Sequence, residues 1–448
     1  MSTLPKRFIC AGILSFVSAS TAYADTYDLS QMYKSAISYD AEIAAAESGY
    51  YAQKEQENTA LSGLLPQLNA SASTAFVDRD VSKGNTSSDS FQSTTYGLSL
   101  SQPLFSMPEW YNLNSAEFGT AAAEAEYLRA KQDLILKVAE AYFDVLRANE
   151  DLTASRALET AVKRQYEQAK EQFDVGLIAI TDVHEAKASY DASQTTRIRA
   201  EGSLTIARET LARITGQYAT KLETLDEDYP ISIDPTNNIQ SWVNSALENN
   251  LSVIAANFNV KSLESNYKSQ RAVHYPTLTL TAGYEDSDND RENLSPFETQ
   301  AEQSNVALNL NIPLYSGGAT QAATKQARFL AEQAKHQLTS AQRAAEIETR
   351  SEFINLRTNV QTVESLRQNI VSRESALEAT KEGYNVGTRN IVEVLDAERN
   401  YFTALRDYAS ARFDFVISSL KVKRAAGSLH EKDIEEINKH LSLATQKL

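Results

Sequence analysis

The chain contains few of the residues that interrupt helices. Its 448 residues include 15 glycines and 9 prolines, which is less than half of the roughly 12% that these two residues reach together in ordinary proteins. Their scarcity disfavours a loop-rich enzyme domain, a sandwich of short strands and a disordered chain. Long, uninterrupted helices are expected instead, in a chain long enough for two or three domains.

Cysteine and basic charge are also scarce. Cys10 is the single cysteine, which excludes a disulfide framework and a thiolate metal cluster. Asp and Glu outnumber Lys and Arg by 59 to 43, whereas a nucleic-acid-binding protein shows a basic patch. The five histidines show no metal-site spacing, and Walker, GxGxxG and GxSxG motifs are absent. We therefore expect no nucleic-acid partner, no cofactor, no metal and no catalytic residue.

The one clear apolar segment lies at the N-terminus. Lys6 and Arg7 precede an apolar run over residues 8–17, and Ala22-Tyr23-Ala24 fits the small-x-small rule for signal cleavage. The alternative is a transmembrane anchor, but the run is too short to cross about 30 Å of hydrocarbon. The sequence therefore predicts a cleaved signal peptide over residues 1–24 and an exported protein that begins at Asp25.

The remainder of the chain consists of two copies of one unit. Five short segments recur 210 or 211 residues later, an interval much longer than a solenoid repeat. Pro230 and Pro235 mark a turn-rich linker between the copies. We predict repeat 1 over residues 25–229, a linker over 230–238 and repeat 2 over 239–442. The matching segments are 64–68 with 274–278, 102–106 with 312–316, 142–147 with 352–357, 173–176 with 384–387, and 211–216 with 422–427.

Each copy is predicted to contain a helical hairpin of unusual length. A first helix over 29–62 or 239–273 precedes a proline, and a second proline, Pro103 or Pro313, closes two strands. The helix that follows spans roughly 100 Å if residues 107–172 are continuous. A helix of this length has to pack against similar helices, as in a coiled coil. The sequence thus predicts long antiparallel α-helical hairpins whose turns lie near Gly176 and Gly387.

Four segments alternate apolar and polar residues with the period of a β-strand. They are predicted over about 67–78, 91–102, 277–286 and 303–312, with long polar loops over 79–89 and 285–300. One face is apolar and the other is Ser, Thr and Asn, which fits either transmembrane strands or a sheet with one face on a core. Export and the uncharged polar face favour transmembrane strands. Because about eight strands are needed to close a barrel, several protomers would have to contribute.

The arrangement of these segments is similar to the TolC family of outer-membrane efflux proteins. The resemblance rests on LLPQL (64–68), QPLF (102–105), VGLIAITDV (175–183) and YNVGTRNIVEVLDAE (384–398), and it extends over the whole chain after the signal segment. It implies an α+β membrane protein that forms a homotrimer, with four strands from each protomer in one twelve-stranded barrel set in outer-membrane lipid. The helices would continue the pore as a tunnel through the periplasm.

The resemblance also implies a function and partners. TolC-like proteins are exit ducts for drugs or secreted polypeptides. They are opened at the periplasmic end by a periplasmic adaptor and an inner-membrane transporter of the RND or ABC type, and they have no catalysis of their own. The alternative is a periplasmic coiled-coil scaffold or adaptor without a pore, although two copies with amphipathic strands disfavour it.

Acidic pairs spaced i,i+3 follow both predicted turns, Asp182 with Glu185 and Glu393 with Asp396. Like charges that share a helix face are mildly destabilising, and a plain solvated face is the alternative reading. The resemblance assigns Glu393 and Asp396 to an acidic ring at the constriction of the pore, where the family usually has Asp at both positions. Such a ring would favour cations.

The resemblance further implies a network that holds the tunnel entrance shut. Its matching members here are Asp182, Tyr384, Arg389, Thr181 and Gln165. An arginine fork and a tyrosine hydroxyl both suit a carboxylate partner. The family partner of Gln165 is an acid, whereas this chain has Lys381 at that position and Glu382 beside it, so the resemblance supports that link less well.

The two turns themselves are the expected contacts for the adaptor. Gly176 and Gly387 permit the positive φ that ends a helix. In the family the residues at these tips mesh with the adaptor, which here implies Gly176 with Leu177 in the first turn and Gly387 with Thr388 in the second.

Overall fold

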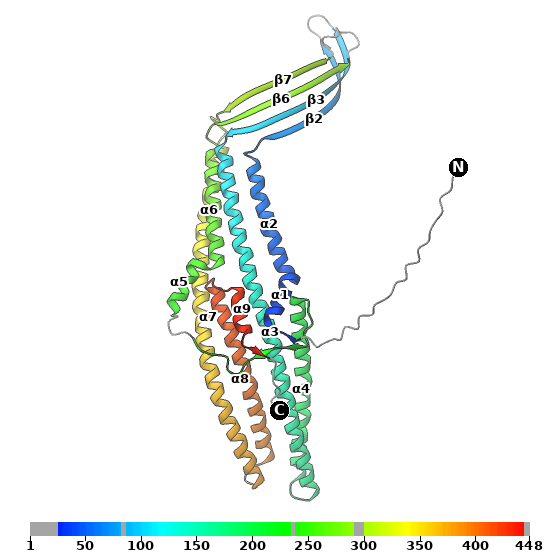
Figure 1. Ribbon diagram of the computed structural model, residues 1–448, viewed down its shortest axis with the longest axis vertical. Helices are drawn as coiled ribbons and strands as arrows, with labels where there is room; N and C mark the ends of the chain where they lie inside the picture. Colours follow the sequence, from blue (N-terminus) through cyan, green and yellow to red (C-terminus); the bar gives the residue numbers. More distant parts are fainter. Residues whose placement is uncertain (1–25, 82–86, 234–237, 291–299, 443–448) are drawn as a thin grey trace, which may run out of the picture.

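The chain folds into an elongated molecule with a sheet at one end and helices along the rest of its length (Figure 1). This computed structural model describes residues 26–81, 87–233, 238–290 and 300–442, so the predicted signal segment 1–24 lies outside the described residues. Much of the two predicted polar loops and four residues of the predicted linker also lie outside them. Within the described ranges, every helix lacks the long apolar stretch that crossing a membrane requires.

Two antiparallel helical hairpins form the body of the molecule. The first consists of α3 (Met107–Asp174) and α4 (Ile180–Thr215), and the second of α7 (Ala319–Asn385) and α8 (Ile391–Ala425). α3 has 68 residues, which corresponds to roughly 100 Å at 1.5 Å per residue. Both hairpins turn at the end of the molecule opposite the sheet (Figure 1). The predicted long helices are therefore present.

The first helix of each repeat is interrupted, which the sequence analysis did not predict. Residues 29–62 form α1 (Leu29–Tyr39) and α2 (Ala41–Ser62), and residues 239–273 form α5 (Ile239–Asn249) and α6 (Leu251–Ala272). Asp40 and Asn250 take an extended conformation at the two breaks, and each caps the helix that follows it. A short polar side chain that satisfies free N–H groups favours a new helix start over a continuous helix.

The sheet combines strands from both repeats. Its order is β2-β3-β6-β7, and every neighbouring pair is antiparallel. The strands are β2 (Gln67–Val81), β3 (Ser87–Phe105), β6 (Thr277–Asp290) and β7 (Gln300–Asn311). The sequence predicts that Pro103 closes the strand, but β3 continues to Phe105 through a bulge. A bulge is one of the few places where a sheet accepts proline.

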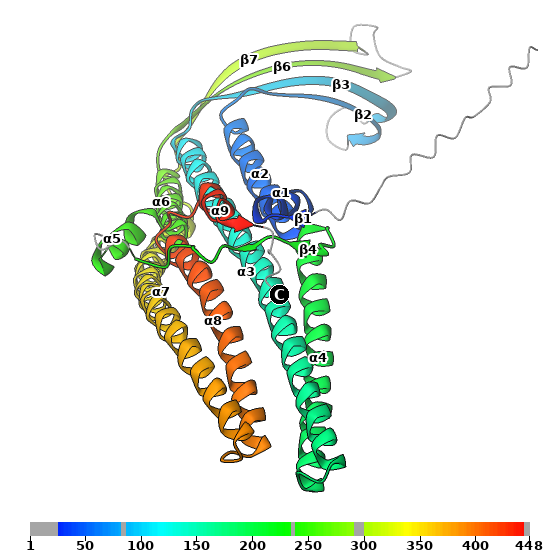
Figure 2. The same ribbon diagram turned by 60° about the horizontal axis from the view of Figure 1, so that its bottom comes forward.

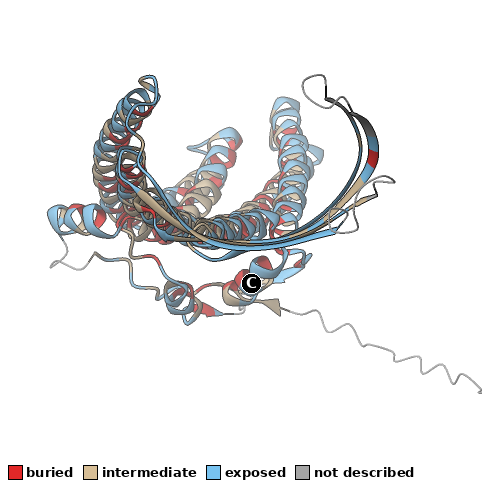
Figure 3. Ribbon diagram, turned by 90° about the horizontal axis from the view of Figure 1, so that it is seen from above, coloured by how far each residue is buried: buried red, intermediate tan, exposed pale blue. Residues whose placement is uncertain are grey.

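The apolar side chains of these strands share one face. Leu68 is paired with Leu100, and Leu280 with Leu308. That face is bare in the single protomer, since Phe76 is 87% and Val306 76% exposed. Seen from above, the sheet and the helices curve in the same sense around a common concave side (Figure 3). The sheet is therefore curved like part of the wall of a cylinder (Figure 3).

A waist of small elements lies against one side of the helices at mid-height (Figures 1 and 2). β1 (Thr26–Tyr27) pairs with β4 (Lys221–Leu222), and β5 (Thr224–Leu225) pairs with β8 (Leu441–Ser442), next to α9 (Glu431–Asn438). The main apolar core lies here. Tyr142 and Phe143 are fully buried in it, and Phe143 lies 5.5 Å from Phe413 of the other hairpin. The waist thus fixes the two hairpins to each other and leaves their far ends to a smaller contact.

Candidate functional site: the tips of the helical hairpins

The two hairpins turn with the same backbone geometry. After α3, the N–H of Gly176 donates to the Phe173 carbonyl at 2.9 Å, and the N–H of Leu177 donates to the Gln172 carbonyl at 2.9 Å. After α7, Gly387 donates to Tyr384 at 3.0 Å and Thr388 to Gly383 at 2.8 Å. Both are Schellman motifs, which satisfy the last free carbonyl groups of a helix.

These turns require glycine because of their backbone conformation, and not because a side chain would collide with a neighbour. Gly176 has φ of +80° and Gly387 of +78°, a region that other residues adopt only at a cost. A β-carbon at either position would meet nothing within 4 Å. The turns are therefore open to solvent, and a partner can approach their backbone closely.

Exposed apolar side chains flank both glycines. Val175 and Leu177 are 71% and 74% exposed in the first tip, and Val386 is 72% exposed in the second, beside exposed Thr388. Exposed apolar groups gathered at one end of a molecule are typical of a contact surface.

A second, smaller apolar cluster joins the hairpins just above the tips. Its buried members are Val162 and Ala169 of α3, Ala186 of α4, and Ile391 and Leu395 of α8. The ring of Tyr384, at the end of α7, packs against this cluster. Its hydroxyl donates to Oε1 of Gln172 on α3 at 3.0 Å. The structure thus links the two tips within one protomer.

Among the predicted gate residues, Asp182 acts on Tyr384 only through its charge. Burial, and after it the charge of Asp182, raises the pKa of Tyr384 above its ordinary value. In the described residues, no hydrogen bond or ion pair joins Asp182 to Tyr384 or Arg389. Thr181 lies exposed in the first turn of α4, next to Asp182.

Arg389 has a different partner in the protomer. From the turn before α8, its Nη1 donates to Oε2 of Glu393, in the first turn of α8, at 2.6 Å. Asp396 is paired in the same way with Arg399 at 2.7 Å. Each acid of the predicted ring therefore has an arginine beside it, Arg389 from the turn for Glu393 and Arg399 from α8 for Asp396. Both pairs are exposed enough to be weak.

Lys381, where the family resemblance expects an acid, is engaged inside its own hairpin. Its ammonium group lies 2.9 Å from the carboxylate of Glu398 on α8, and Glu398 is only 1% exposed. Gln165 is half-buried on α3, and its side chain forms no hydrogen bond within the described part of the chain. Within the described residues of one protomer, no hydrogen bond joins Gln165 to Lys381.

Three residues of this site were missed by the sequence analysis. Gln172 binds Tyr384, and Glu398 binds Lys381. Gly383 lies against the Arg389 side chain, since a β-carbon at position 383 would lie 2.7 Å from Cγ of Arg389. Gly383 had a readable signal, since it is a glycine inside the last turn of a predicted helix. The other two depend on how the helices pack, which the sequence pattern does not specify.

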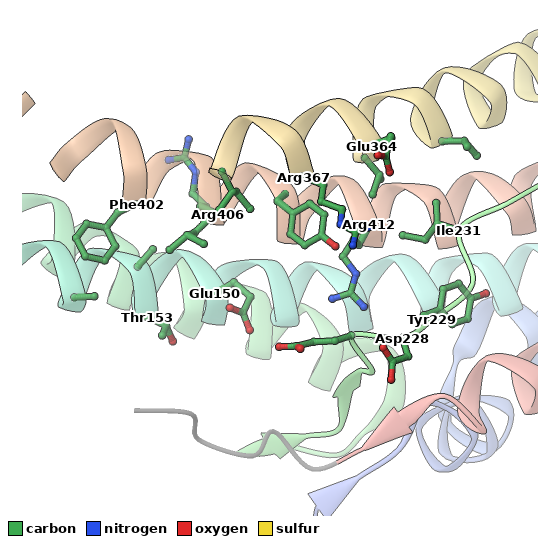
Figure 4. A pocket seen from close by; sticks show the side chains of 18 residues that line it. Glu150, Thr153, Asp228, Tyr229, Ile231, Glu364, Arg367, Phe402, Arg406 and Arg412 are labelled. Atoms are coloured by element: carbon green, nitrogen blue, oxygen red, sulfur yellow. The ribbon is translucent and has the colours of Figure 1, made fainter. Parts of the chain in front are cut away.

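A cavity lies at the waist, away from the tips (Figure 4). It has a volume of about 1100 Å³ and lies between α3, α7, α8 and residues 227–231. Arg412 points toward Glu150 and Asp228 and also donates to the carbonyl of Asp226. The lining mixes acids and arginines and favours no particular ligand.

Comparison with known proteins decides the family. The model of the family described as outer membrane efflux protein matches this chain twice, over residues 32–217 and 242–428. The chain belongs to the outer membrane efflux protein family. Members of this family are outer-membrane channels, and the outer membrane is the location of this protein.

Two curated relatives and one solved structure support the same family. The chain is 34% identical to outer membrane protein TolC of Vibrio cholerae serotype O1, with 99% of this chain and 100% of TolC covered. It is 25% identical to alkaline protease secretion protein AprF of Pseudomonas aeruginosa, with 90% of this chain and 85% of AprF covered. The crystal structure of the outer membrane protein VceC from Vibrio cholerae superposes with a TM-score of 0.76 at 18% identity, covering 89% of this chain and 96% of VceC.

Proposed function

We propose that three copies of this efflux protein form one duct that carries drugs, and polypeptides of type I secretion, out of the cell. The sheet supports this assembly most directly. β2 and β7 are open edges of a four-stranded sheet with one bare apolar face. Four strands cannot close, whereas three such sheets supply twelve strands. The apolar face would then contact outer-membrane lipid, and the helices would line a tunnel in the periplasm.

The division of the chain belongs to the same proposal. After removal of a signal peptide, residues 1–24, repeat 1 (25–229) and repeat 2 (239–442) would each supply two strands and one hairpin to the wall. The separate matches of the family model to the two halves support this division.

The tips are proposed as the entrance and its lock. Asp182, Tyr384, Arg389, Thr181 and Gln165 would hold neighbouring hairpins together in the trimer, above a ring formed by Glu393 and Asp396. Exposed ion pairs contribute about 1 kcal/mol or less each, so a docking partner can open such a lock. A periplasmic adaptor would dock on Gly176, Leu177, Gly387 and Thr388 and connect the duct to an inner-membrane transporter of the RND or ABC type.

Replacement of Arg389 tests the lock. Arg389→Ser removes the guanidinium from the tip, and we expect a larger single-channel conductance of the purified protein in planar bilayers. Arg328→Ser is the matched control, because Arg328 forms the same i,i+4 pair with Glu332 on α7, far from the tip. If both variants conduct like the unmodified protein, Arg389 does not lock the entrance.

A further inference from the structure

We propose that Gln172 is a positioning residue of the entrance, which couples the two tips of each protomer by holding the hydroxyl of Tyr384. The inference rests on the proposed lock, to which it adds a member on α3 that the family resemblance did not indicate. The hydrogen bond itself joins residues 212 positions apart, on two different hairpins.

Gln172 serves both hairpins at once. Its main-chain carbonyl accepts the N–H of Leu177 at 2.9 Å and so closes the first tip. Its side-chain oxygen accepts the hydroxyl of Tyr384 at 3.0 Å. Beside Tyr384, the carbonyl of Gly383 accepts the N–H groups of Thr388 and Arg389, which closes the second tip. The bond between Gln172 and Tyr384 therefore joins the two hydrogen-bonded turns through the backbone, so that a displacement of one tip is transmitted to the other.

The surroundings of Tyr384 fix the direction of its hydroxyl. The ring packs against the apolar cluster between the hairpins, as do Ile178 and Tyr166. Because the phenol stays protonated in this partly buried place, it remains a hydrogen-bond donor at neutral pH. Gln172 supplies an uncharged acceptor, so the link does not depend on salt, in contrast to the exposed ion pair of Arg389.

The internal repeat makes this link one-sided. Gln172 and Phe173 lie 211 residues before Gly383 and Tyr384. Repeat 1 thus has the amide acceptor but no hydroxyl, and repeat 2 has the hydroxyl but no side chain at the acceptor position. Only one of the two symmetric bonds can form in each protomer, which gives three such links in a trimer.

The central experiment compares Gln172→Leu with Gln168→Leu in single-channel recordings. Gln168 is exposed one turn earlier on α3. Loss of one net hydrogen bond, about 1 kcal/mol, corresponds to a roughly fivefold change in an equilibrium. We therefore expect Gln172→Leu to raise the open-to-closed ratio about fivefold or more and Gln168→Leu to leave it unchanged. Gln172→Glu, which keeps an acceptor oxygen, should restore most of the closure.

Further variants separate this inference from the proposed lock. Tyr384→Phe should raise opening, and adding Gln172→Leu to it should raise opening no further, because the two residues share one bond. If Arg389→Ser and Tyr384→Phe increase opening but Gln172→Leu does not, the role of Gln172 is wrong and the lock stands. If none of the three changes opening, the lock itself is wrong.

A cross-link tests whether the bond lies within one protomer. Cys10 is the chain's single cysteine, so Gln172→Cys with Tyr384→Cys, in a protein lacking residues 1–24, supplies the reactive pair. A short bis-maleimide should produce an internal link, detected as a joined peptide in the monomer band of a denaturing gel. Covalent dimers and trimers in place of that product would show that Tyr384 faces a neighbouring protomer and would overturn the proposal.

Discussion

At the scale of single residues, Gly383 determines where the Arg389 side chain can lie. A β-carbon at position 383 would come within 2.7 Å of Cγ of Arg389 and 3.3 Å of Oγ1 of Thr388. The Arg389 side chain reaches Glu393 across this glycine. The glycine is thus needed for close approach, which differs from the requirement for positive φ at Gly176 and Gly387.

Gly383→Ala should therefore open the entrance. The added methyl group displaces Arg389 from Glu393, and we expect conductance to change in the same direction as for Arg389→Ser. Gly202→Ala is the control, because a β-carbon at this α4 position meets nothing within 4 Å and alanine favours a helix by up to about 1 kcal/mol over glycine. Equal conductance in the two variants would show that Arg389 keeps its place without the glycine.

The sequence predicted the tip residues to different degrees. The two turn glycines follow from their register in the repeat, and the structure places both at the predicted tips. The contact of Arg389 with Glu393 could have been read from their i,i+4 spacing. The bond of Tyr384 to Gln172 could not, because it depends on how α3 and α7 pack across a sequence distance that no local pattern spans.

At the scale of elements, Asp40 and Asn250 explain why the first helices break. They lie 210 residues apart, at equivalent positions of the repeat. Each accepts two N–H groups of the helix that it caps. The second polar atom of each side chain has a different partner. Oδ2 of Asp40 binds Lys137 at 2.8 Å, and Nδ2 of Asn250 donates to the Ala425 carbonyl at 2.9 Å. The paired register was visible in the sequence, whereas the choice of a break over a continuous helix depended on these tertiary partners.

The pairing of Asp40 should make stability depend on pH. Burial alone would raise the pKa of Asp40, but the hydrogen bond from Lys137 and the N–H groups of Glu42 and Ile43 outweigh it and hold the pKa below its ordinary value. A lowered pKa in the folded state stabilises the fold above the ordinary aspartate range near about 4, and this contribution is lost as the pH falls through the lowered value.

Asp40→Asn keeps the cap but removes the charge. We expect a loss of about 1 kcal/mol at pH 7, seen as a lower thermal unfolding temperature in detergent, and a smaller difference from the unmodified protein in acid. Asp191→Asn, at an exposed position of α4, should change neither value. A difference for Asp40→Asn that stays constant from neutral to acidic pH would contradict the assigned role of the charge.

At the scale of the whole molecule, the sheet leaves one apolar face and two edges uncovered. The alternation of the strands and the length of the hairpins were predictable, and the structure and the family confirm an α+β channel fold. The small strands at mid-height and α9 were not predicted, because short elements with long-range partners leave little periodic signal. The bare apolar face and the two open edges are what the proposed trimer would cover.

The most direct test of this account is a planar-bilayer recording of the purified, detergent-extracted protein. A trimeric duct should give discrete channels that prefer cations, with a weaker preference in Glu393→Ala combined with Asp396→Ala, since these acids would line the constriction. A protein that stays soluble as a monomer without detergent and forms no channels would contradict the duct and would favour a periplasmic scaffold without a pore.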